Sequence, residues 1–225
     1  MAISDSLQAT KTRLDAACVA AGRAPGAVGL LPVTKTFPAD AVREAFAAGA
    51  RAFGENYVQE GLAKIDALAD LRPQIAWHLI GPLQSNKTRP VAEQFDWVHS
   101  VDRLKVAQRL SEQRPAHLPD LQVCLQVNIS GEASKSGALP EEVPALAQAV
   151  AALPRLHLRG LMAVPEPGPG ARAQHDAMAA LFQQLQSQGL ALDTLSLGMS
   201  ADLEDAVAAG STLVRVGSAI FGART

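Results

Sequence analysis

Hydrophobic residues in this chain form short runs, and these alternate with longer stretches in which apolar residues recur at helical spacing. Eight short runs predict buried strands, over residues 28–34, 51–54, 76–80, 97–100, 121–129, 158–164, 194–197 and 212–216. The longer stretches predict helices over residues 7–21, 39–48, 58–69, 87–95, 103–113, 141–153, 171–188 and 202–209. Such alternation of strands and helices is typical of a parallel sheet.

About eight strand–helix units in 225 residues predict an α/β fold, a single (β/α)8 TIM barrel with an extra N-terminal helix. An open, doubly wound sheet is the alternative, because periodicity alone does not establish that a sheet closes. No stretch has the composition of an interdomain linker, so residues 1–225 are expected to form one domain. The Pro/Gly-rich residues 164–170 follow a predicted strand and indicate a surface loop at the rim of a site.

The composition excludes several classes of protein. The formal net charge is −2, and the basic residues are scattered, which argues against a nucleic-acid surface. Cys18 and Cys124 stand in unrelated contexts, so we expect a reducing compartment, no disulfide framework and no metal site. The N-terminal stretch is charged and amphipathic, and no apolar run approaches the roughly 20 residues of a membrane helix. We therefore expect a cytoplasmic protein without membrane contact.

Lys35 ends the first predicted strand. A cation at the end of a buried strand is costly to desolvate unless a partner or a covalent bond uses it. In strand–helix barrels, the carboxyl ends of the strands carry the chemistry. A lysine there either binds a phosphate as a cation or forms a Schiff base through its neutral amine. A salt bridge at the rim is an equally consistent interpretation of Lys35 alone.

Two glycine-containing turns lie near the other end of the chain. Residues 198–200 precede a predicted helix, and residues 217–218 follow the last predicted strand. Barrels often bind phosphate near their final strands, and a helix N-terminus offers free N–H groups to an anion. Alternatively, Ser200 is simply an N-cap and Asp202 complements the helix dipole. Together with Lys35, the two turns indicate pyridoxal phosphate.

Strand parity predicts where two further polar side chains point. If alternate residues of the last strand pack against helices, Arg215 points into the barrel. A buried arginine needs a partner, and we favour a cofactor contact over a structural ion pair. In the fifth strand the same argument turns Asn128 inward, where it is expected to face ligand or water.

Other polar residues have weaker signals. Asn56 and Tyr57 follow the second predicted strand and are candidates for contact with a cofactor ring. His78 lies within a strand, where a lone histidine is more often a core residue than a ligand contact. Lys135 belongs to a polar segment whose favoured interpretation is an ordinary surface loop, although a second binding role stays open.

Motifs over nearly the whole chain resemble those of the YggS/PROSC family, the pyridoxal phosphate homeostasis proteins. The most specific are FGENYVQE at residues 53–60 and WHLIGPLQSNK at residues 77–87. Shorter motifs lie at residues 33–35, 134–137, 160–162, 197–200 and 214–217.

The resemblance implies a barrel similar to the N-terminal domain of alanine racemase, with pyridoxal 5'-phosphate (PLP) bound as a Schiff base to Lys35. It also implies phosphate contacts around Ser200, Gly217 and Ser218, with Arg215 facing the pyridine nitrogen. A guanidinium beside that nitrogen opposes its protonation, which makes the cofactor a weaker electron sink. The family is regarded as controlling the supply of the cofactor, without an established catalytic activity.

Racemases of this fold also need a second acid/base group, a tyrosine from another domain or subunit. Tyr57 is the sole tyrosine of this chain, and no second domain is predicted to complete a closed site. The sequence therefore predicts a monomeric PLP-binding protein that maintains vitamin B6 homeostasis and delivers PLP to apo-enzymes. The alternatives are a PLP-dependent amino-acid racemase and a Schiff-base aldolase acting on a phosphosugar without a prosthetic group.

Overall fold

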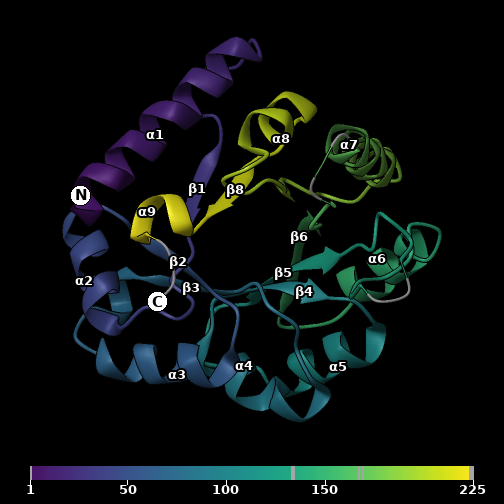
Figure 1. Cartoon of the computed structure of the whole chain (residues 1–225). Helices are drawn as coiled ribbons and strands as arrows, with labels where there is room; N and C mark the ends of the chain where they lie inside the picture. The colour runs from purple at the N-terminus through teal and green to yellow at the C-terminus, as the bar shows by residue number, and fades with distance from the viewer. Residues whose placement is uncertain (1, 133–134, 167, 169, 223–225) are drawn as a thin grey trace.

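In the part of the chain that the structure describes, eight parallel strands form one sheet at the centre of the molecule (Figure 1). The computed structural model describes residues 2–132, 135–166, 168 and 170–222. The strands are β1 (Gly29–Pro32), β2 (Ala52–Glu55), β3 (Ala76–Leu79), β4 (Trp97–Val101), β5 (Leu121–Gln126), β6 (Leu156–Met162), β7 (Thr194–Ser196) and β8 (Leu213–Val216). All eight predicted strands are present, which confirms the sequence pattern.

The sheet curls until its two ends, β1 and β2, meet. Their strand order places them at opposite ends of the sheet, and a bridge between Val33 and Gly54 joins them. Pro32 has no N–H to extend this pairing. Inside the sheet, His99 Nδ1 of β4 lies 3.0 Å from Ser196 Oγ of β7, three strands away. Such a contact requires a curled sheet, so the barrel prediction is confirmed over the open-sheet alternative.

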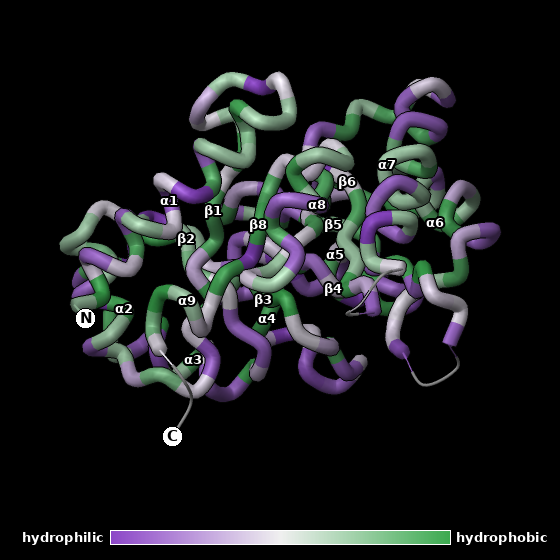
Figure 2. The backbone as a smooth tube through the Cα atoms, turned by 45° about the horizontal axis from the view of Figure 1, so that its top comes forward, coloured by the Kyte–Doolittle hydropathy of each residue, from purple (hydrophilic) through white to green (hydrophobic). Residues whose placement is uncertain are grey.

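Helices surround the strands as an outer ring (Figure 1). They are α1 (Ile3–Ala20), α2 (Ala39–Ala47), α3 (Val58–Ala67), α4 (Thr88–Gln94), α5 (Leu104–Gln113), α6 (Val143–Ala151), α7 (Ala171–Ser187), α8 (Leu203–Ala209) and α9 (Ser218–Phe221). Figure 2 shows hydrophobic strands at the centre and helices that alternate between hydrophobic and hydrophilic residues. In α5, for example, the buried residues are Val106, Ala107, Leu110 and Ser111, which face the sheet.

Three short elements were not predicted: the 3-10 turns η1 (Arg72–Gln74) and η2 (Ser85–Lys87), and helix α9. These elements are too short to show a hydrophobic period. Within the described residues, no helix combines the length and the apolar character needed to cross a bilayer.

The prediction that Asn128 points inward to face ligand or water is wrong, because β5 ends at Gln126 rather than at residue 129. Asn128 is buried, and its Nδ2 donates to Glu132 O at 2.8 Å while its Oδ1 accepts from Gly131 N at 3.1 Å. Its amide therefore closes a local loop. Strand parity failed here because the backbone leaves the sheet two residues earlier.

Candidate functional site

A pocket of about 350 Å³ opens at the carboxyl ends of the strands and brings together the residues singled out in the sequence. Its lining includes Lys35, Asn56, Ser200, Arg215, Gly217 and Ser218. Val33, Phe37, Ile80, Val164 and Met199 supply apolar walls. Contact of these residues with a cofactor stays a prediction, but their convergence in one pocket is a feature of the fold.

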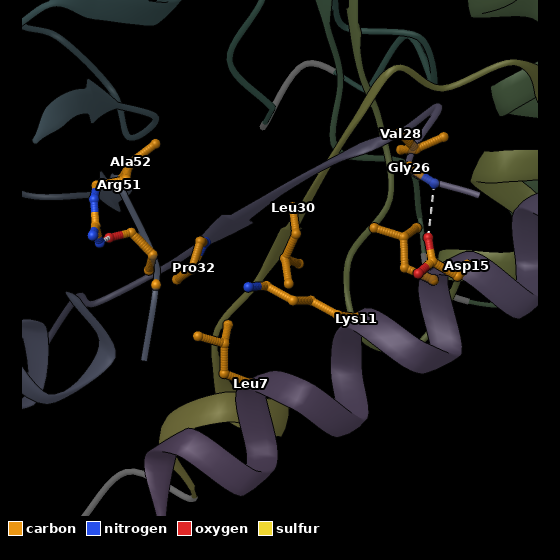
Figure 3. A pocket seen from close by; sticks show the side chains of 12 residues that line it. Leu7, Lys11, Asp15, Gly26, Val28, Leu30, Pro32, Arg51 and Ala52 are labelled. Carbon is orange, nitrogen blue, oxygen red and sulfur yellow. Dashed lines mark hydrogen bonds between the residues drawn. The ribbon is translucent and has the colours of Figure 1, made fainter. Parts of the chain in front are cut away.

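A second pocket, of about 400 Å³, lies between helix α1 and the side of strand β1 (Figure 3). Leu7 and Lys11 of α1 face Leu30 and Pro32 of β1 across it. None of the six predicted site residues lines this pocket. Pocket volume therefore does not identify the functional site. The chemistry of the residues at the carboxyl ends of the strands does.

Lys35 lies in a turn directly after the point where β1 meets β2. Thr34 is fully buried, and its N–H donates to Gly54 O at 3.0 Å. Lys35 is half-buried, and Thr36 follows it with φ of 69°, in the left-handed region. The lysine thus stands at the pocket wall on the first residues that leave the barrel.

A buried group of charges lies behind this turn. Lys64 Nζ of α3 is 2.8 Å from Glu55 Oε1 and 2.9 Å from Glu60 Oε1, and it donates to Thr34 O at 2.5 Å. Burial raises the pKa of Glu55, and the Lys64 ammonium opposes this rise. The sequence offered a partial signal, because Glu60 and Lys64 are four residues apart on a predicted helix.

Arg215 points into the barrel, as strand parity predicted, and is 4% exposed. Its Nη1 donates to Ser196 O at 2.6 Å and Ser196 Oγ at 2.7 Å, and its Nη2 donates to Ala163 O at 2.9 Å. Burial lowers its pKa to about 10, so it remains a cation at neutral pH. Among the described residues no carboxylate forms an ion pair with Arg215, and its side chain is part of the pocket lining.

A chain of hydrogen bonds extends from Arg215 into the core. Ser196 Oγ lies 3.0 Å from His99 Nδ1, and His99 Nε2 lies 2.9 Å from His78 Nδ1. His78 stacks on Trp97 with ring centroids 5.0 Å apart. Burial lowers the pKa of His78 to about 3 and that of His99 well below its usual range. His78 is therefore a neutral core residue and does not line the pocket.

The turn after β7 is fixed by Asp202, which is the N-cap of α8. Its Oδ1 accepts from Met199 N at 2.8 Å, and its Oδ2 lies 2.9 Å from His175 Nε2. Ser200 is thus not the N-cap. Gly198 has φ of 91°, and a Cβ there would lie 2.5 Å from Ala206 Cβ, so this turn needs glycine.

Helix α1 holds the same turn from outside. Arg13 Nη1 donates to Ser200 O at 2.9 Å, and the Arg13 guanidinium pairs with Glu204 at 2.7 Å. Directly after the neighbouring strand β8, Gly217 is the N-cap residue of α9, whose first residue is Ser218. The roles of Arg13 and His175 could not be predicted from the sequence, because each bonds to a turn that is distant from it in the chain.

Asn56 and Tyr57, adjacent in sequence, have different environments. Asn56 Oδ1 is buried and has no hydrogen-bond partner among the described residues, although Asn56 lines the pocket. Tyr57 is 58% exposed and is not part of the lining. Of the two candidates for ring contact, the structure places Asn56 in the pocket and Tyr57 outside it.

Lys135 pairs with Glu132 at 2.9 Å and with Glu166 at 3.6 Å, and it does not line the pocket. These partly exposed ion pairs are typical of a surface loop. Ser134 of the same motif lies outside the described residues, as do Pro167 and Pro169 of the predicted rim loop.

Gly81 positions Asn56 by close backbone packing, so Gly81→Ala is expected to lower the free energy of unfolding by about 1–3 kcal/mol. A Cβ at this position would lie 2.0 Å from Asn56 O and 2.7 Å from Asn56 Cα. Urea unfolding measures the effect, and Gly170→Ala is the control, since its nearest neighbour is Gln174 Nε2 at 3.9 Å. Equal stability of the two variants would contradict this close-packing argument.

Residues 7–225 match the family described as alanine racemase, N-terminal domain. The pyridoxal phosphate homeostasis protein of Pseudomonas aeruginosa is 63% identical over 222 residues, which cover 99% of this chain and 96% of that protein. The chain belongs to the family of pyridoxal phosphate homeostasis proteins. Among solved structures, PipY from Synechococcus elongatus PCC7942, described as a COG0325 family member with PLP bound, has a TM-score of 0.84 at 38% identity, covering 98% of this chain and 100% of PipY.

Alanine racemase from Corynebacterium glutamicum shares the fold, with a TM-score of 0.70 at 19% identity. The match covers 96% of this chain and 61% of the racemase. The racemase therefore has a large part that this chain does not match.

Proposed function

We propose that this chain binds PLP covalently through Lys35 and buffers the free cofactor in the cell. The observation that carries the proposal is the convergence of Lys35 with the turns after β7 and β8 in one pocket, in a member of this family. PLP supplies an aldehyde: the Lys35 amine adds to its carbon, water leaves, and a reversible C=N bond forms.

The residues of the pocket fit such a ligand. Its volume of about 350 Å³ lies in the usual range of small-molecule sites. The unpartnered Asn56 Oδ1 can accept a hydrogen bond from a ligand. Ser200, Gly217 and Ser218 offer hydroxyl and backbone N–H groups to a phosphate. These features support binding of a phosphorylated aldehyde at this end of the barrel.

Arg215 has a separate role in the proposal, beside the pyridine nitrogen. Its charge is not balanced by an ion pair among the described residues, and three hydrogen bonds to Ser196 and Ala163 fix its guanidinium. A fixed cation there keeps the ring nitrogen unprotonated, which disfavours carbanion chemistry. Arg215 therefore favours binding of the cofactor rather than catalytic turnover of a substrate.

Absence of turnover is the second part of the proposal. Tyr57 is exposed and lies outside the pocket lining, so it is not placed as an acid/base partner of Lys35. An open pocket that exchanges its imine with other amines suits delivery to apo-enzymes. We propose that the chain acts as a monomer in the cytoplasm and that apo-enzymes are its partners.

The visible absorption spectrum with added PLP tests the proposal. Wild type is expected to be yellow and to lose its colour with borohydride, which leaves a reduced PLP adduct on Lys35 that peptide mass spectrometry locates. Lys35→Ala is expected to lack the absorption band while keeping its circular dichroism. The exposed Lys105→Ala serves as a control for loss of a surface lysine.

Two outcomes would overturn the proposal. A colourless wild-type protein that still condenses a phosphosugar through Lys35 would identify an aldolase. Amino-acid racemisation by the purified yellow protein, abolished by Lys35→Ala, would identify a racemase.

A further inference from the structure

The backbone beside Lys35 adopts a conformation that its sequence disfavours. Thr36 is β-branched and has φ of 69°, whereas left-handed backbone is normally occupied by Gly, Asn or Asp. A branched residue keeps this conformation only where its surroundings impose it, and such positions cluster at functional sites. The contacts that impose it therefore reveal what the turn is built to do.

Both neighbours of Lys35 are anchored to the same group of charges. On one side, the Thr36 N–H donates to Glu60 Oε1 at 2.5 Å. On the other side, Thr34 O accepts from Lys64 Nζ at 2.5 Å, and Thr34 Oγ1 donates to Glu55 Oε1. The main chain is therefore fixed immediately before and immediately after the lysine.

Lys64 joins the two carboxylates into one unit. Its Nζ lies 2.8 Å from Glu55 Oε1 and 2.9 Å from Glu60 Oε1, and the Lys64 and Glu55 side chains are 6% and 0% exposed. Glu55 ends strand β2, and Glu60 and Lys64 belong to helix α3. The group is therefore attached to two rigid elements, and buried charges that pair in this way are fixed in geometry.

We propose that Glu60, with Lys64 and Glu55, is a positioning group that directs the Lys35 side chain into the pocket by holding Thr36 in the left-handed region. None of the three lines the pocket, so they act through the turn. The inference rests on the proposed function, in which PLP is held at two points. The phosphate is seated on turns from β7 and β8, so the amine must arrive at the aldehyde from one direction.

The test combines removal of the anchor with relief of the backbone. Glu60→Ala removes the acceptor of the Thr36 N–H, and it is expected to weaken PLP binding by about tenfold or more, as loss of a supporting hydrogen bond does at other sites. Glu60→Gln keeps an acceptor oxygen and is expected to stay within about threefold of wild type. Titration of the visible absorption band measures the affinity, and circular dichroism and the melting temperature report on folding.

Thr36→Gly distinguishes positioning from a general structural role. Glycine adopts positive φ without strain, so Thr36→Gly/Glu60→Ala is expected to recover at least about threefold of the affinity lost in Glu60→Ala. Glu93→Ala is the matched control, because Glu93 forms another i,i+4 pair, with Arg89 at 3.8 Å on the surface of α4. This control is expected to bind PLP as wild type does.

The outcomes separate the two proposals. Absence of a Lys35-dependent band in wild type would refute the proposed function, whatever these variants show. With that band present, wild-type affinity in Glu60→Ala would overturn the positioning role. Equal losses in Glu60→Ala and Glu60→Gln, with no recovery by Thr36→Gly, would also overturn it, because charge or folding would then explain the effect.

Discussion

Lys64→Met is expected to lower the free energy of unfolding by roughly 3–5 kcal/mol at neutral pH. The substitution removes an ammonium whose side chain is 6% exposed and leaves the fully buried Glu55 carboxylate without its cation. Glu55 Oε2 already has no hydrogen-bond partner among the described residues. A buried charge that loses its partner retains the full desolvation penalty, and methionine preserves most of the packing. Urea unfolding followed by circular dichroism measures the loss.

The origin of this loss can be checked with pH and with a second substitution. Burial already raises the pKa of Glu55, and loss of Lys64 raises it further. The deficit of Lys64→Met is therefore largest at high pH and shrinks as the pH falls and the carboxyl takes up a proton. Glu55→Gln/Lys64→Met is expected to recover a large part of the stability. The exposed pair of Arg43 and Asp70, with a closest distance of 2.7 Å, is the control, and Arg43→Ala should have little effect. A pH-independent deficit would contradict this explanation.

Acid is expected to destabilise the protein through its buried histidines, with a loss on the order of 4 kcal/mol from His78 alone by about pH 3. Burial lowers the pKa of His78 to about 3, and the usual value is 6.5. Between these values the unfolded chain binds a proton that the folded chain does not. The free energy of unfolding therefore decreases as the pH is lowered, by up to about 1.4 kcal/mol per pH unit for each such histidine.

Variants separate this effect from the titration of carboxylates. In His78→Gln the slope of unfolding free energy against pH, measured between pH 6.5 and 4, should be shallower than in wild type by up to about 1.4 kcal/mol per unit. His117→Gln is the control, because His117 is exposed in the folded chain. Acid titration of the PLP absorption band should show whether Arg215 loses its position together with the His78–His99 pair. An unchanged slope in His78→Gln would mean that His78 is charged in the fold.

The two predictions concern groups that flank the pocket from different sides. Lys64 and its carboxylates lie behind the Lys35 turn, whereas His78 and His99 lie beneath Arg215. Neither group lines the pocket, so each supports a pocket residue from the interior. The candidate site therefore depends on buried polar contacts as much as on the residues that would touch the cofactor.

The order of the strands and helices and the edge at which the pocket residues meet follow from the sequence alone, whereas closure of the sheet into a barrel was decided by contacts such as the bridge between Val33 and Gly54. Alternating strand and helix patterns specify parallel strands, and the carboxyl ends of parallel strands lie at one edge. Lys35, Asn56, Ser200 and Arg215 each stand at or just beyond such an end, so their convergence was predictable from local patterns.

Tertiary structure alone decided which polar groups support that site. The pairing of His99 with Ser196 across the barrel, of Asp202 with His175 and of Thr36 with Glu60 joins residues on different elements. The tertiary structure also decided that β5 ends at Gln126, so that the Asn128 side chain bonds within the following loop. A hydrophobic period reports which face of an element is buried, but it carries no information on which polar atom on another element will satisfy a buried donor or acceptor.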